Sequence, residues 1–287
     1  MELLLVVLAY AAMVSIWGTT WLGIKVSLIG LPPLWGAGLR FLLAGAVLYA
    51  MAFALRVDLR RHAPPLHLVF VLALTMFGIN YALTYLAETH LASGLVAVLF
   101  GTLPFFVFAF AHRMVEERLT RRTTVGALLA FGGVAVISLA GGVRGELVFV
   151  LAALVAAASS GFANVYLKKY ADSEPLATLP PAMLLAGAGL TLGGFAFERV
   201  NWHAAAQPPT IAAVLYLAIL GSAIAFYLNH WLLQRIDSGT VGLSALMIPV
   251  LAVMVGALLG GETFGVRELA GALLVVLGVW TSLAARR

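Results

Sequence analysis

The sequence contains no cysteine and few charged residues. Only 10% of its 287 residues are Asp, Glu, Lys or Arg, whereas soluble domains average about 25%. The absence of cysteine excludes a disulfide framework and a thiolate metal site. Because 63% of the residues are hydrophobic and the mean hydropathy is +1.05, polar side chains are too few to cover a water-exposed surface. The composition therefore predicts an integral membrane protein.

Motifs of enzymes are also missing. The sequence has no H-E-x-x-H and no G-x-S-x-G. Its histidines are scattered, mainly near the ends of apolar runs: His62, His67, His90, His112, His203 and His230. Every Asp and Glu lies at the end of such a run or between runs, which argues against an antiporter of the small-multidrug type that binds cations on a mid-membrane carboxylate. An intramembrane enzyme is therefore disfavoured, and no cofactor or metal is expected.

The apolar runs are long enough to cross a membrane as helices. Crossing the hydrocarbon core takes about 20 mostly apolar residues. Strand alternation, which an outer-membrane barrel requires, is absent. The first run is longer than a signal peptide and no basic segment precedes it, so it is interpreted as a permanent span. The sequence predicts an all-α integral membrane protein with ten transmembrane helices, at about 4–28, 33–54, 67–88, 91–112, 123–141, 146–168, 177–197, 210–232, 239–259 and 266–284.

Basic residues are distributed unevenly between the two sides. With the N-terminus inside, the outer joints contain only Arg144, Arg199 and Arg267. The positive-inside rule then places both termini in the cytoplasm, in a bacterial inner membrane. The net charge of +5 follows from these loops and predicts no nucleic-acid partner. The cytoplasmic joints and tail contain Arg56, Arg60, Arg61, Arg113, Arg118, Arg121, Arg122, Lys168, Lys169, Arg235, Arg286 and Arg287.

A shift of 145 residues superposes the two halves of the sequence. The single membrane domain 1–287 then divides into two repeats of five spans, 1–142 and 146–287. Because five is odd, the second repeat enters the membrane from the opposite side, as in the inverted repeats of secondary transporters, whose sites lie near the midplane. The shift pairs Ser93–Gly94 with Ser238–Gly239, Pro104 with Pro249, Glu117 with Glu262, Gly126 with Gly271, Gly133 with Gly278, Trp17 with Phe162, and Trp21 with Tyr166.

Several motifs carry a resemblance to a known family. They are W-G-x-x-W at Trp17–Trp21, the pair Arg40–Phe41, Pro104 within the fourth span, E-R-L-T at Glu117–Thr120, and G-E-T at Gly261–Thr263, where that family often has Glu-Arg-Leu. The chain resembles the drug/metabolite transporter superfamily of the EamA type, above all the YddG-type exporters of aromatic and other neutral amino acids. The resemblance implies that spans 1, 3, 4, 6, 8 and 9 line a central cavity.

Polar and aromatic residues within the spans are the candidates for the substrate cavity. In a membrane, polar side chains must be kept away from lipid, whereas leucine can face it. Polar side chains within spans therefore face a cavity or a partner helix. The aromatic residues could instead pack or lie in the interfacial belt, and Asn80 and Asn229 could bond between helices. The cavity candidates are Trp17, Thr20, Trp21, Asn80, Tyr81, Thr84, Phe100, Ser159, Phe162, Tyr166, Phe226, Asn229, His230, Ser244 and Met247.

Two cations and two prolines complete the candidate site. Lys25 and Arg40 lie within spans, in the outer half. They could capture a substrate carboxylate, or they could snorkel to the outer surface or pair with a carboxylate such as Glu88 or Glu262. Pro104 and its counterpart Pro249 each release a backbone carbonyl, which predicts either hinges or static kinks.

The sequence thus predicts a secondary transporter that exports small neutral metabolites, above all aromatic and other neutral amino acids, by alternating access. Its expected partners are a small-molecule substrate and the lipid bilayer. A multidrug transporter or a transporter of nucleoside or sugar derivatives is the alternative within the superfamily. An intramembrane enzyme and a passive channel are remote alternatives.

Overall fold

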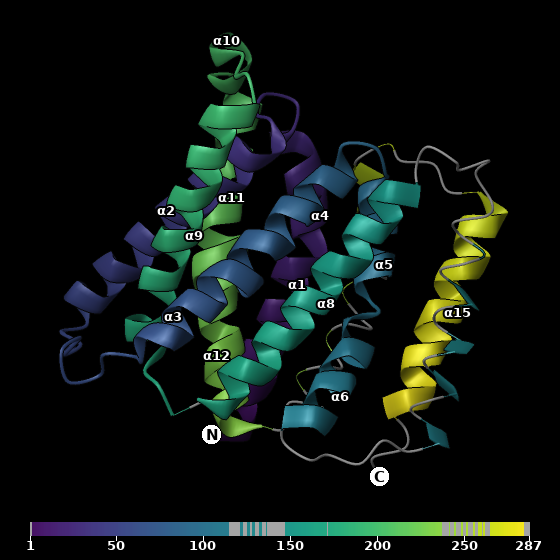
Figure 1. Ribbon diagram of the computed structural model, residues 1–287, viewed down its shortest axis with the longest axis horizontal. Coiled ribbons are helices and arrows are strands. Elements are labelled where there is room, and N and C mark those ends of the chain that lie inside the picture. Colours follow the sequence, from purple (N-terminus) through teal and green to yellow (C-terminus); the bar gives the residue numbers. More distant parts are fainter. Residues whose placement is uncertain are drawn as a thin grey trace.

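The computed structural model describes residues 2–114, 147–170, 172–236 and 265–283, with single residues and short runs between 121 and 136 and between 241 and 261 (Figure 1). Within these residues the regular elements are helices. Seven stretches are long and apolar enough to cross a membrane. The predicted spans 123–141 and 239–259 lie largely outside the described residues.

Four of the predicted spans are single helices. They are α1 (Glu2–Ser27), α2 (Pro33–Ala54), α8 (Leu147–Lys169) and α9 (Pro175–Phe197). A further helix, α15 (Val266–Leu283), lies beside α5 (Ser93–Phe100) at one edge of the bundle (Figure 1). The short helix α10 (Trp202–Ala205) lies in the joint after α9. These boundaries differ from the predicted ones by about two residues or fewer.

Proline marks where several helices begin. Pro33, Pro175 and Pro208 occupy the first positions of α2, α9 and α11 (Pro208–Ala218). There the missing N–H has no intrahelical partner to lose. The carboxylate of Glu198, just after α9, accepts hydrogen bonds from the backbone N–H groups of Leu34 (2.9 Å) and Trp35 (3.1 Å). Glu198 therefore caps the N-terminus of α2 and joins the two helices.

The third and eighth spans each contain a π-helical segment, which the hydropathy pattern does not predict. The third consists of α3 (Leu66–Val71), η1 (Leu72–Ile79) and α4 (Asn80–Glu88). The eighth consists of α11, η2 (Ile219–Ile224) and α12 (Ala225–Arg235). A shift of 145 residues carries η1 onto 217–224, which contains η2. Short π-helical segments widen a helix locally and are frequent at functional sites.

The fourth span is broken rather than bent. Helix α5 ends at Phe100, a turn follows at Gly101–Thr102, and α6 (Leu103–Met114) begins. Pro104 therefore stands in the first turn of α6, where proline is tolerated without a kink. The sequence predicts a proline in the middle of a continuous helix, and the break at Gly101–Thr102 differs from that expectation.

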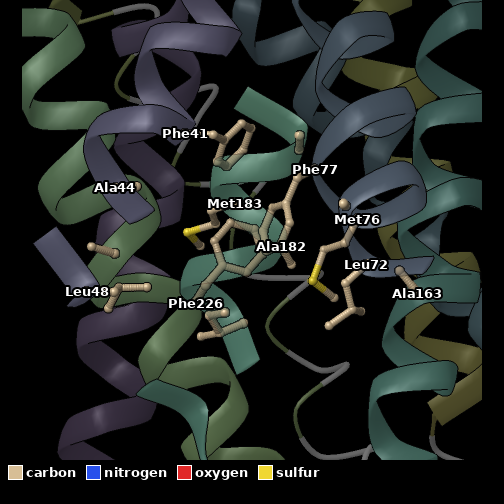
Figure 2. Close-up of a cluster of buried hydrophobic side chains, with 14 of the residues drawn as sticks. Phe41, Ala44, Leu48, Leu72, Met76, Phe77, Ala163, Ala182, Met183 and Phe226 are labelled. Carbon is tan, nitrogen blue, oxygen red and sulfur yellow. The ribbon is translucent and has the colours of Figure 1, made fainter. Parts of the chain in front are cut away.

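Close approach of α2 and α9 depends on glycine. A Cβ atom added to Gly187 would lie 2.7 Å from the backbone nitrogen of Leu42, and one added to Gly45 would lie 2.7 Å from Cγ of Leu184. Small residues at such a contact let two helix backbones approach within a membrane, where burial of leucine adds no driving force. The core beside this contact contains Phe41, Phe77, Met183 and Phe226 (Figure 2).

The spans of one half pack on spans of the other. Helix α1 lies against α11 and α12, whereas α8 lies against α4, η1 and α6. Both π-helical segments are therefore in contact with a helix from the opposite half of the chain. Figure 1 shows α4 toward one end of the bundle and α12 toward the other.

Candidate functional site

A cluster of five aromatic rings occupies the middle of the bundle, between both halves of the chain. We call Trp17, Phe41, Phe77, Tyr81 and Phe226 the central ring cluster. The ring of Phe226 lies 5.3 Å from that of Trp17, 5.0 Å from that of Phe77 and 6.3 Å from that of Tyr81, measured between centroids. Edge-to-face contacts of this kind are favourable beyond the area that they bury. The close-up in Figure 2 shows Phe41, Phe77 and Phe226 converging from three segments.

The π-helical segment η2 presents polar groups to this cluster. The carbonyl oxygen of Gly221 accepts hydrogen bonds from Trp17 Nε1 (3.3 Å) and from Arg40 Nη2 (3.1 Å). Arg40 Nε donates to Oγ of Ser222 (2.7 Å). The Arg40 guanidinium carbon also lies 4.5 Å from the centroid of the Tyr81 ring, within cation–π distance. Trp17, Arg40 and Tyr81 are thus held together around η2.

Arg40 does not snorkel to the outer surface. Its side chain is only 1% exposed, and within the described structure its hydrogen-bond partners are a carbonyl and a hydroxyl rather than a carboxylate. The expectation of snorkelling is therefore wrong for this residue. Arg40 stays inside because of tertiary packing. The carbonyl of Gly221 and the hydroxyl of Ser222 reach α2 because η2 packs against that helix.

Lys25 also points into the protein. Its Nζ donates to the backbone carbonyls of Glu88 (2.8 Å) and Leu91 (2.9 Å). It therefore caps the C-terminal end of α4, where cations are favoured by the helix dipole. The partner in the third span is the one expected from sequence, but the acceptor is the main chain of Glu88 instead of its carboxylate.

The other candidates of the first half lie close to this arrangement. Thr20 is buried, its hydroxyl bonds to the carbonyl of Trp17 (2.8 Å), and a Cβ atom added to Gly221 would lie 2.7 Å from its methyl group. Trp21 is buried, with its ring 5.4 Å from that of Phe100. The backbone therefore brings α1 close to η2 on one side and to α5 on the other.

Asn80 and Thr84 bond within their own span. The Asn80 side-chain nitrogen donates to the carbonyl of Met76 in η1 (3.0 Å), and Thr84 donates to the Asn80 side-chain oxygen (3.4 Å). The interhelical bond considered for Asn80 is not the one that forms. Ser159 instead joins two spans, because its hydroxyl donates to the carbonyl of Thr75 in η1 (2.8 Å).

Candidates of the sixth span form a second group of rings. We call Phe110, Phe162, Tyr166, Tyr170 and His67 the α8 ring group. Phe162 lies 5.4 Å from Phe110 and 5.8 Å from Tyr166 between centroids, and Tyr170 lies 5.4 Å from Tyr166 and 5.2 Å from His67. Phe162 and Tyr166 of α8, and Tyr170 just after its end, recur every four positions and so lie in one stripe. Unlike Trp21, the equivalent Tyr166 is only partly buried.

The remaining candidates fall in three places. Asn229 and His230 are buried on α12, beyond Phe226, and Ser244 is buried as well. Met247 and Pro249 lie outside the described residues. Among the residues that the structure describes, no group of three His, Asp or Glu side chains could hold a metal ion.

Sequence reasoning missed part of the site. Phe77 and Gly221 are ordinary apolar residues by pattern, and their roles follow from the two π-helical segments. One signal was available for Phe77, since the shift of 145 pairs it with Ser222, which lies on the same face as Phe226 in the eighth span. Tyr170 and His67 lie at helix ends, where aromatic residues are normally assigned to the membrane interface.

This arrangement of long apolar helices around buried polar groups defines a multi-pass membrane protein. The model of the EamA-like transporter family matches residues 3–139 and again 147–284. The chain therefore belongs to the EamA-like transporter family, within the drug/metabolite transporter superfamily, and is a membrane transporter.

Relatives of similar length carry transporter names. An uncharacterized transporter of Bacillus subtilis, YoaV, is 28% identical over 284 residues, covering 96% of this chain and 95% of that protein. A Salmonella typhimurium protein named "probable amino-acid metabolite efflux pump" is 29% identical, covering 93% of this chain and 91% of that protein. The inner membrane transporter YedA of Escherichia coli K12 is 29% identical, covering 89% of this chain and 83% of that protein.

One solved crystal structure is similar in fold. It superposes with a TM-score of 0.76 at 24% identity, covering 98% of this chain and 99% of that chain. The family and the names of the relatives indicate transport rather than catalysis.

Proposed function

We propose that this transporter exports aromatic and other neutral amino acids, as the YddG-type exporters do, across the bacterial inner membrane by alternating access. The observation that carries the proposal is the contact between the central ring cluster and the buried guanidinium of Arg40. Rings provide an apolar surface for a hydrophobic side chain, while a cation in the same place favours a ligand with a carboxylate. The name of the Salmonella relative agrees with an amino-acid metabolite as substrate.

The proposed architecture is ten transmembrane helices in two inverted repeats, 1–142 and 146–287, with both termini in the cytoplasm. Two features of the structure support the repeat. The π-helical segments occur at equivalent positions. Tyr81 and Phe226 are a pair related by 145 residues, and their rings face each other at 6.3 Å. Equivalent residues that touch lie near the axis that relates two repeats, which argues for a central site there.

The proposed substrate contacts come from both halves. In the first half we assign Trp17, Thr20, Asn80 and Tyr81 to the walls, with Trp21, Thr84 and Phe100 toward the outer side. In the second half Phe226, Asn229 and His230 continue the wall, and Ser159, Phe162, Tyr166, Ser244 and Met247 lie along the route to the cytoplasm. The break at Gly101–Thr102, just before Pro104, is assigned as the hinge of the fourth span, and the equivalent Pro249 as the hinge of the ninth.

Uptake into proteoliposomes tests the proposal. The full chain would be reconstituted and offered a panel of labelled aromatic, aliphatic and acidic amino acids, with and without a pH gradient. We expect saturable uptake of the neutral apolar ones and little of the acidic ones. Movement of quaternary ammonium drugs without movement of any amino acid would favour the multidrug alternative and refute the proposal.

A further inference from the structure

Arg40 is a charged group held deep within the membrane domain. Its side chain is 1% exposed, and placing a guanidinium inside a bilayer is expensive unless its N–H groups find acceptors. Nε and Nη2 have acceptors in Ser222 and Gly221. Nη1 is buried and has no hydrogen-bond partner within the described part of the chain. One nitrogen of the Arg40 guanidinium therefore lacks a hydrogen-bond acceptor among the described residues.

A second buried donor lies beside it. Tyr85 is fully buried, and its hydroxyl lies within interaction range of the side chains of Arg40 and Ser27, yet it makes no hydrogen bond of regular geometry among the described residues. Tyr85 follows Tyr81 by four residues on α4, so both face the same side of that helix. Since the Tyr81 ring lies against the Arg40 guanidinium, the two unsatisfied donors border the central ring cluster.

A buried hydrogen-bond donor without an acceptor destabilises the folded protein, and it does so more strongly when it is charged. A ligand with two acceptor oxygens would satisfy both donors at once. We propose that Arg40 Nη1 and the Tyr85 hydroxyl bind the carboxylate of the transported molecule, while its apolar side chain lies against Tyr81 and Phe226. This inference rests on the proposed function, and it narrows the substrate to compounds with a free carboxylate next to an apolar group.

The structure distinguishes Arg40 from Lys25 as the carboxylate ligand. The Lys25 ammonium is already bonded to two carbonyls at the end of α4. Arg40 also lacks a counterpart in the second half, because a shift of 145 residues leads to Leu185. Because Arg40 lies on one side of the central ring cluster, it gives the bound molecule one preferred orientation.

Ligand binding to the purified full chain tests the inference. The probes are L-phenylalanine, its amide, which lacks the carboxylate, and 3-phenylpropionate, which lacks the amine. Affinity is measured from the ligand-induced rise in melting temperature in detergent. We expect the two acids to bind about tenfold or more tightly than the amide, since hydrogen bonds to charged groups are strong. Tyr85→Phe should lower the affinity for both acids about tenfold and leave that for the amide unchanged.

Tyr49→Phe is the matched control, because Tyr49 lies on α2 away from these contacts, and it should behave as the parent does. Arg40→Lys, which keeps the charge but loses the planar guanidinium, should also reduce the preference for acids. Equal binding of acid and amide by the parent, or equal weakening of both by Tyr85→Phe, would overturn the inference. The inference and the proposed function can fail separately. If the parent protein binds acids preferentially but transports no amino acid, the carboxylate site stands and the proposed export of amino acids is refuted.

Discussion

Lys25 donates a 2.8 Å hydrogen bond to the backbone carbonyl of Glu88. Lys168 donates a 2.6 Å hydrogen bond to the carbonyl of Leu233, which is the residue 145 positions after Glu88. Each lysine thus joins the end of one helix, α1 or α8, to the C-terminal end of the span that contains a π-helical segment. The two contacts lie toward opposite ends of the bundle, like α4 and α12 in Figure 1. In the proposed cycle they hold the outer and the inner side closed.

Removing one lysine should therefore open one side only. The sequence has no cysteine, so the equivalent residues Thr84 and Asn229 can each be replaced by a single cysteine reporter. Lys25→Met should raise labelling of the Thr84→Cys reporter by an impermeant maleimide from outside by about tenfold or more, because two charge-assisted hydrogen bonds are lost. Lys168→Met should do the same for Asn229→Cys from inside.

Lys169→Met controls for the loss of a basic residue beside Lys168, because Lys169 is exposed. It should leave labelling of both reporters unchanged. If Lys25→Met and Lys168→Met raise labelling from both sides alike, the lysines are general structural braces and not separate latches.

Truncation of Trp17 should affect transport, whereas truncation of Phe226 should affect stability. Trp17 is partly exposed and touches one ring of the central ring cluster, so Trp17→Ala should reduce transport and alter side-chain preference while the protein still folds. Phe226 is 6% exposed and contacts three rings, so Phe226→Ala should destabilise by about 3–5 kcal/mol. Melting temperature and uptake, measured on the same preparations, check both. Wild-type selectivity in Trp17→Ala would assign that ring to packing alone.

Phe162 provides the corresponding test in the second half. It belongs to the α8 ring group and is partly buried, so Phe162→Ala removes contacts without leaving a sealed cavity. We expect transport to fall, with the larger effect when substrate is offered from the cytoplasmic side. Inside-out and right-side-out vesicles separate the two directions. An equal loss in both directions would contradict the placement of this ring on the cytoplasmic route.

The contact between α2 and α9 should not accommodate a larger side chain in place of glycine. Gly187 faces the backbone of Leu42, so even a methyl group requires the helices to separate. Gly187→Leu should abolish folded protein, as judged by size-exclusion chromatography in detergent. Gly189→Leu is the matched control, because a Cβ atom there meets nothing within 4 Å, and it should express normally. A stable Gly187→Leu protein would show that this contact adapts.

Topology can be checked independently of transport. Reporters fused after Arg61 and Lys169 should be cytoplasmic, because basic joints stay inside. A reporter after Ala205, beyond the α10 helix, should be periplasmic. A periplasmic signal at Lys169 would refute the inverted arrangement, since it would place the end of the sixth span on the outer side.

The sequence by itself determined the membrane class, the family and most span boundaries. Hydropathy runs and prolines are local properties, so α2 begins and ends where the sequence predicts, at Pro33 and Ala54. The sequence also predicted the aromatic candidates Trp17, Tyr81 and Phe226, because polar and aromatic residues within membrane spans tend to face a cavity or a neighbouring helix. That they touch one another is a property of the packed bundle.

Only the tertiary structure decided the partners of the charged groups. Arg40 binds Gly221 and Ser222, more than 180 residues away, and such distant pairs leave no periodic signal along the chain. The π-helical segments were equally hidden, because η1 and η2 have the same apolar composition as ordinary helix. Their backbone geometry depends on the helices packed around them, and the position of the buried Gly221 carbonyl in turn helps to decide where the guanidinium of Arg40 lies.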